Sequence, residues 1–268
     1  ESAPQPHEIL VVHDEPDDDD NDGGEKPPQA MLPSGKRRSQ SGDDMSILVR
    51  IGVVEGQGVT QTRSLVPIEL FPYVLSDDSL YFGDLRFYST YDLTLGGSVG
   101  LGYRRYHSGV DRIFGISGWY DGDNAREDHY FQQLGLSLET YGDLFDFRTN
   151  FYLPVGDTSQ QSSLRLVENS TRFSGENVLY DQVRSFYSAM RGLDLEAGVP
   201  LPGRFVEEHG VRIYGGFYHY DDDHDGSITG GSARIQANIV SGLDIGGQVP
   251  NDSFYKTRGR GNLSWTCG

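Results

Sequence analysis

The sequence lacks the features that mark several common protein classes. It has one cysteine, Cys267, among 268 residues, so it cannot form an internal disulfide. It has no run of about 18 apolar residues, which excludes a transmembrane helix but not transmembrane strands, since each strand needs only about 9–11 residues. Basic residues are few, 22 against 40 acidic ones, and the net charge of −18 makes nucleic acid an unexpected partner.

Glycine and aromatic residues are abundant instead. The chain contains 35 glycines and 12% aromatic residues, although only 36% of it is hydrophobic. This composition is unusual for a compact soluble core. It suits strands whose apolar residues are spread over one broad outer surface.

The stretch from Leu95 to Asp123 shows the pattern of the chain most clearly. In LGGSVGLGYRR apolar residues alternate with Gly, Ser and Arg, and IFGISGWYDGD repeats the alternation after a short turn. A period of two predicts strands with two unlike faces. We count twelve such strands, joined by short turns at one end and by several longer loops at the other. This predicts an all-β fold, a closed antiparallel twelve-stranded up-and-down transmembrane β-barrel without free strand edges.

The charged residues indicate which face is wet. Burying so many ions in a dry core would cost several kcal/mol per ion even after pairing. We therefore predict that Leu136, Phe147, Ile213 and Ile235 face lipid. A soluble β-sandwich also has one wet and one apolar face and stays open as an alternative here. The charged residues predicted to face the lumen are Arg148, Asp194, Glu196, Arg212, Arg234, Lys256, Arg258 and Arg260.

Aromatic residues near the predicted strand ends suggest an interfacial girdle, the arrangement found at both edges of membrane barrels. The alternative is that they are ordinary strand aromatics. The residues concerned are Tyr73, Tyr103, Trp119, Tyr120, Tyr130, Tyr152 and Trp265.

Composition divides the chain into two parts. Residues 1–45 contain PDDDDND and GGEKPP, too polar to bury a core, and are predicted to be a disordered acidic arm. Residues 46–268 are predicted to form the outer-membrane β-barrel, with residues 155–188 as a long, polar loop insert. A barrel in the outer membrane must be exported. Because no signal peptide is present in this sequence, we expect a processed N-terminus.

One acidic loop is a candidate metal site. Asp221, Asp223 and Asp225 occupy positions 1, 3 and 5 of a calcium loop, with Gly226 at position 6. Ser232 at position 12 cannot supply the bidentate carboxylate, so weak calcium binding in the Asp221–Ser227 loop competes with a simple hydrated loop. We expect no other cofactor and no enzyme activity, since the histidines lack metal-ligand spacing.

Several segments resemble one known family in order and spacing. They are LYFGDLRFYSTYD, GGSVGLGYRRY, IFGISGWYDGD, YFQQLGLSLETYGDLFDFRTNFYLPVG and RGLDLEAGVPLPG. Together they resemble the β-barrel of the intimin/invasin family, the inverse autotransporters. The resemblance implies an outer-membrane barrel whose C-terminal linker passes back through the lumen and carries a passenger, often an adhesin, to the cell surface.

The resemblance also implies partners. These are the lipid bilayer, the barrel-assembly machinery and a C-terminal passenger that would follow Gly268, where this sequence ends. The leading function is therefore a translocator or anchor that exports or displays an attached segment. A stand-alone outer-membrane pore or structural barrel is the alternative, and a soluble β-rich binding module is the third possibility.

Overall fold

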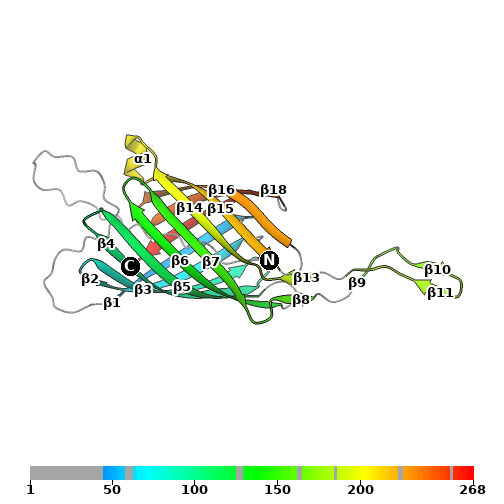
Figure 1. The fold of residues 1–268 in the computed structure, drawn as a ribbon. Coiled ribbons are helices and arrows are strands. Elements are labelled where there is room, and N and C mark those ends of the chain that lie inside the picture. The colour runs from blue at the N-terminus through cyan, green and yellow to red at the C-terminus, as the bar shows by residue number, and fades with distance from the viewer. Residues whose placement is uncertain are drawn as a thin grey trace, which may run out of the picture.

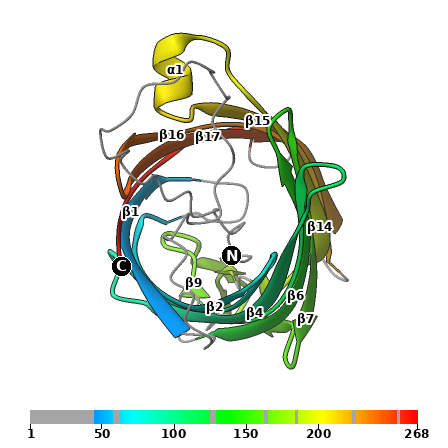
Figure 2. The same ribbon diagram turned by 90° about the vertical axis from the view of Figure 1, so that its left-hand side faces the viewer.

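The computed structural model describes residues 45–57, 63–124, 129–161, 165–183, 186–222, 226–253 and 256–268. The predicted acidic arm lies outside the described residues, apart from Met45, which begins the first strand. Twelve long strands form one closed barrel, seen from the side in Figure 1 and from one end in Figure 2. They are β1 (Met45–Gly56), β2 (Leu65–Ser76), β3 (Ser79–Thr90), β4 (Leu95–His107), β5 (Arg112–Asn124), β6 (Tyr130–Gly142), β7 (Asp146–Val155), β14 (Arg191–Pro200), β15 (Arg212–Asp222), β16 (Gly226–Val240), β17 (Leu243–Asp252) and β19 (Arg260–Cys267).

Barrel closure joins the first strand to the last. Each long strand pairs antiparallel with the next along the chain, and β19 pairs with both β17 and β1. In the closing pair Val49 lies opposite Cys267 and Gly56 lies opposite Arg260. The predicted closed twelve-stranded barrel is thus confirmed.

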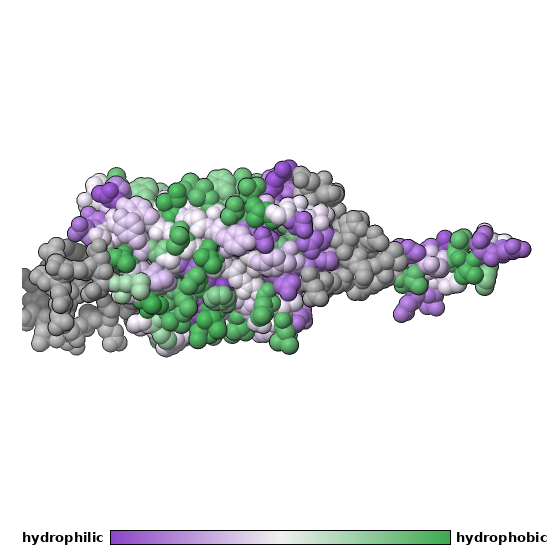
Figure 3. All heavy atoms as spheres, turned by 90° about the horizontal axis from the view of Figure 1, so that it is seen from below, coloured by the Kyte–Doolittle hydropathy of each residue, from purple (hydrophilic) through white to green (hydrophobic). Residues whose placement is uncertain are grey.

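The alternation along each strand separates an outer from an inner face. Leu136, Phe147, Ile213 and Ile235 are all exposed on the outside, whereas Ser137 and Arg148, one residue further along β6 and β7, are buried inside. Hydrophobic residues gather on the side of the barrel that Figure 3 shows. The interior holds mostly polar, charged and aromatic side chains, as the two-faced strand pattern requires.

Short turns connect the strands at one end of the barrel. Asp77 and Asp78 link β2 to β3, and Ser241 and Gly242 link β16 to β17. Gly242 has a φ of +79°, and a Cβ there would lie 2.6 Å from the Thr266 carbonyl oxygen, so this turn requires glycine. At the same end a short helix, α1 (Arg204–Glu208), interrupts the connection from β14 to β15.

The opposite end carries the predicted loop insert, which is more regular than its sequence suggested. Three nested strand pairs build a long hairpin that projects from the barrel (Figure 1). Strands of two or three residues are too short to show alternation in the sequence, so the segment was predicted as a loop. The pairs are β8 (Ser159–Gln161) with β13 (Phe186–Ser188), β9 (Arg165–Leu166) with β12 (Gln182–Val183), and β10 (Arg172–Ser174) with β11 (Asn177–Leu179).

Among the described residues, no helix is long and apolar enough to cross a membrane.

Candidate functional site: the charged lumen wall

Five charged side chains form a row across one part of the inner wall, which we call the charge row. It consists of Arg104 on β4, Glu139 on β6, Arg148 on β7, Glu196 on β14 and Arg234 on β16. The strand register aligns its centre, because Arg148 lies directly opposite both Glu139 and Glu196. The sheet thus places opposite charges side by side at this level of the lumen.

The two outer arginines of the charge row make close ion pairs. Arg104 Nε lies 2.5 Å from Glu139 Oε1. Arg234 donates through Nε and Nη2 to the two oxygens of Glu196, at 3.0 and 2.6 Å. Arg148 Nη2 is more distant, 3.7 Å from Glu196 Oε2. The central arginine is therefore the most weakly paired member.

A glycine makes the pair between Arg104 and Glu139 possible. Gly115 on β5 lies between them in the register. A Cβ at this position would lie 2.6 Å from Glu139 Oε1. The missing side chain lets Glu139 lie across β5 and reach an arginine two strands away.

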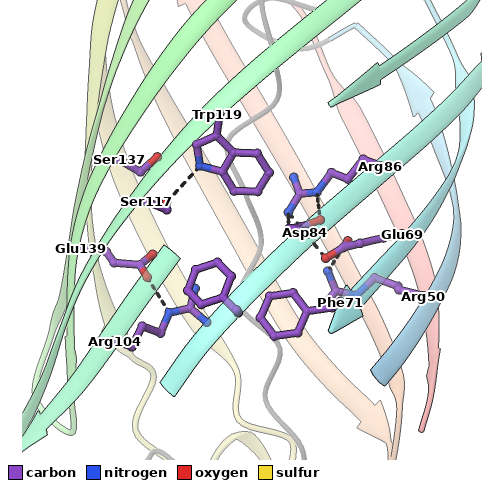
Figure 4. A pocket seen from close by; sticks show the side chains of 11 residues that line it. Arg50, Glu69, Phe71, Asp84, Arg86, Arg104, Ser117, Trp119, Ser137 and Glu139 are labelled. Atoms are coloured by element: carbon purple, nitrogen blue, oxygen red, sulfur yellow. Dashed lines mark hydrogen bonds and ion pairs between the residues drawn. The ribbon is translucent and has the colours of Figure 1, made fainter. Parts of the chain in front are cut away.

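A second cluster occupies the wall formed by β1, β2 and β3. Arg50 Nη1 donates to Glu69 Oε2 at 3.0 Å, and Arg86 binds both oxygens of Asp84 at 2.7 and 3.1 Å. Figure 4 shows these side chains around a small cavity together with Trp119, whose ring centroid lies 4.9 Å from the Arg86 guanidinium carbon. The cavity holds about 10 Å³, room for roughly one water molecule.

Asp194 is held by neutral donors rather than by a close arginine. Asn150 Nδ2 and the Tyr152 hydroxyl each donate to it at 2.7 Å, and the Tyr220 hydroxyl lies 3.5 Å away. Tyr152, Tyr218 and Tyr220 pack together inside the barrel. Tyr152 and Tyr220 therefore combine packing inside the barrel with hydrogen bonding to the partly buried carboxylate of Asp194.

The predicted aromatic girdle needs correction at three positions. Tyr73 lies on the inner face, because it is opposite the buried Phe82 and its ring packs beside that of the inward Phe71. Trp119 and Tyr152 are only 5% and 7% exposed and lie on the inner face. Both occupy positions that alternate with the outward apolar positions of their strands. They were predicted to be girdle residues because they are large and aromatic. Tyr120, Tyr130 and Trp265 lie on the outer surface.

The other predicted lumen residues have different surroundings. Arg212 forms an ion pair with Asp146, and Arg258 Nη2 lies 3.0 Å from Asp252 Oδ2. Arg260 is half-buried at the start of β19.

The sequence pattern placed Lys256 in the last barrel strand, and the structure places it outside that strand. It lies in β18 (Lys256–Thr257), a two-residue strand paired with β17, and its side chain is exposed. Its φ of +62° breaks the extended backbone, so the last barrel strand begins only at Arg260.

The candidate calcium loop is only partly described. Asp223 and Asp225 lie outside the described residues, and Asp221 accepts a hydrogen bond from Arg191 Nη2 at 2.8 Å. Within the described ranges, no group of three or more His, Cys, Asp or Glu residues could hold a metal ion. The calcium site remains a prediction.

Sequence reasoning missed Glu69, which links Arg50 and Arg86 in the second cluster. Its strand carries Pro67 and Pro72, which obscure the alternation, and Phe71 faces inward beside it. The signal that could have found it is the register, which pairs Glu69 with Arg50 on one side and with Arg86 on the other.

A solved structure with a TM-score above 0.5 supports the fold. A chain from work on the in-meso crystallization of membrane proteins superposes with a TM-score of 0.58 at 13% identity, covering 82% of this chain and 83% of that one. The KdgM porin in complex with disordered oligogalacturonate gives a TM-score of 0.48 at 8% identity, over 82% and 99%. An outer membrane channel from Pseudomonas putida F1 gives 0.46 at 10% identity, over 83% and 94%.

No curated protein matches the sequence. The family of inverse autotransporter β-domains, however, matches residues 50–209, which is more than half of the chain. The match spans β2 to β14 and includes the segments whose resemblance to this family was seen in the sequence. The chain therefore belongs to the inverse autotransporter family, and it is a β-barrel of the outer membrane.

Proposed function

We propose that this barrel anchors a segment that follows its last strand and exports it to the cell surface, where the segment acts as an adhesin-like passenger. The family match over residues 50–209 is the observation that carries the proposal. The same match supports a non-enzymatic role, assembly by the barrel-assembly machinery and a passenger as partner.

The topology gives this proposal a defined path. Because the strand number is even, the start of β1 and the end of β19 lie at the same end of the barrel, the end with the short turns. In bacterial outer-membrane barrels the short turns face the periplasm. A segment that continues from Cys267 would therefore run the length of the lumen to reach the end that carries the projecting hairpin.

Epitope accessibility tests the proposal on intact cells. The same epitope is placed after Gly268, in the hairpin turn at Gly175–Glu176, or in the β4–β5 turn at Ser108–Gly109, in three otherwise identical chains. We expect antibody to reach the first two epitopes on intact cells and the third only after permeabilisation. The Gly175 and Ser108 positions are matched controls, because they mark the two ends of the barrel.

One outcome would contradict export. If the hairpin epitope is reached while the epitope after Gly268 stays inaccessible, the barrel is correctly inserted but does not translocate its C-terminal segment. That result would favour the stand-alone pore, which conductance in planar bilayers would then measure.

A further inference from the structure

The charge row contains one more positive than negative charge. Arg104, Arg148 and Arg234 share two carboxylates, those of Glu139 and Glu196. Arg234 already engages both oxygens of Glu196. Both oxygens of Glu139 are also engaged, one by Arg104 and the other by the Tyr141 hydroxyl. The surplus charge therefore resides on Arg148.

Arg148 also has donors that the surrounding wall leaves unused. Its side chain is 5% exposed, and its buried Nε and Nη1 groups have no hydrogen-bond partner within the described part of the chain. A buried guanidinium N–H without an acceptor is costly, so this position favours a group that brings one. A carboxylate is the strongest acceptor that a peptide can offer to a guanidinium N–H, because the hydrogen bond is assisted by both charges.

A small cavity lies beside this arginine. It holds about 30 Å³, the space of roughly two water molecules, and is lined by Arg148, Asn150, Asp194, Glu196, Tyr218 and Gln248 among others. Asp194 and Glu196 would both repel an anion. The two oxygens of Asp194, however, already accept hydrogen bonds from Asn150 and Tyr152, and those of Glu196 accept from Arg234. The cavity therefore combines room for one small polar group with an under-used cation.

We propose that Arg148 is a carboxylate-binding residue of the lumen wall, and that its ligand is the side-chain carboxylate of an acidic residue in a peptide segment inside the lumen. The peptide source rests on the proposed function. The existence of the carboxylate site does not rest on the proposed function, and carboxylate binding can be measured on the purified barrel.

Trifluoroacetate is the probe, and its ¹⁹F line width in the presence of detergent-solubilised barrel reports binding. We expect Arg148→Gln to weaken binding about tenfold or more, the range of one lost charge-assisted contact. Arg148→Lys keeps the charge but loses the guanidinium N–H donors, so its binding should lie between that of the unmodified chain and that of Arg148→Gln. The different gel mobility of folded and boiled barrel confirms that each variant is folded. Unchanged binding in folded Arg148→Gln would overturn the proposal.

Two further variants test the charge count. Glu196→Gln leaves Arg148 and Arg234 without their shared carboxylate and should tighten binding. Arg234→Gln releases Glu196 to Arg148 and should weaken it. Changes in the opposite sense would overturn the assignment of the surplus charge to Arg148.

Arg212→Gln is the matched control, because it removes an equal charge from an arginine that has its own partner, Asp146. Binding should stay close to that of the unmodified chain. An effect as large as that of Arg148→Gln would mean that the general potential of the lumen, and no specific site, attracts the probe.

Paired pentapeptides distinguish the two sources of a carboxylate. A peptide with one central glutamate should displace trifluoroacetate, whereas the glutamine peptide should not. If trifluoroacetate binds but neither peptide displaces it, the site serves a free small anion and the peptide ligand is refuted. None of these outcomes depends on epitope display, so failure of this inference and failure of the export proposal are distinguishable.

Discussion

Replacing Leu136 by arginine tests the membrane face of the barrel most directly. Leu136 lies near the middle of β6, is 43% exposed on the outer surface, and has Gly118 and Phe151 as its cross-strand neighbours. Outward arginine at the bilayer midplane costs about 2–4 kcal/mol in outer-membrane barrels, and the cost falls to about 0–1 kcal/mol near the interfaces. We expect Leu136→Arg to lower the free energy of unfolding by about 3 kcal/mol.

The depth dependence provides the control. Tyr130 begins the same strand, also points outward and is 49% exposed, so Tyr130→Arg should cost less than about 1 kcal/mol. Urea unfolding in phospholipid vesicles, followed by tryptophan fluorescence and gel mobility, measures both values. Equal costs at the two positions, or a negligible cost at Leu136, would mean that this face does not contact hydrocarbon and would refute the assigned register.

Two further comparisons concern the inner wall. Glu139→Gln leaves Arg104 without its carboxylate in a nearly buried pair and should lower the free energy of unfolding by about 3 kcal/mol. Arg172→Ala removes an exposed ion pair of the hairpin and should lower it by less than about 1 kcal/mol. Similar values for the two variants in urea unfolding would show that the lumen screens its charges as strongly as bulk water does. Gly100→Ala places a Cβ 2.5 Å from the indole ring of Trp119 and should lower the free energy of unfolding by about 1–3 kcal/mol. The control, Gly118→Ala, places its Cβ in open space and should leave the free energy of unfolding nearly unchanged. An unchanged value for Gly100→Ala would show that the indole can move away freely.

The fold was predictable from sequence because its signal repeats along most of the strands. A side-chain period of two leaves no freedom in the face assignment once the apolar positions are known, since a slip of one residue would turn Arg148 outward and Phe147 inward. Strand number and turn positions then determine closure. The predicted outward positions of Leu136, Ile213 and Ile235 depend on nothing else.

The details of the inner wall could not be predicted in the same way. The pairing of Arg104 with Glu139 depends on the register of three strands and on the missing side chain of Gly115 between them. Large aromatics such as Trp119 were assigned to the membrane interface by residue type, although their phase along the strand places them inside. Lys256 lies outside the last barrel strand because its backbone has a positive φ, a conformation that its sequence context does not indicate.

The arrangement of the ion pairs bears on how a polypeptide could share this lumen. Three of the ion pairs described above join strands that are neighbours or one strand apart: Arg50 on β1 with Glu69 on β2, Arg104 on β4 with Glu139 on β6, and Arg234 on β16 with Glu196 on β14. Such pairs lie along the wall and do not tie one side of the barrel to the other. A polar segment could therefore pass beside them without separating any buried pair, a step that would otherwise cost about 3–5 kcal/mol each time. Arg148, which is only loosely engaged, is the position in this wall where a passing carboxylate would gain most.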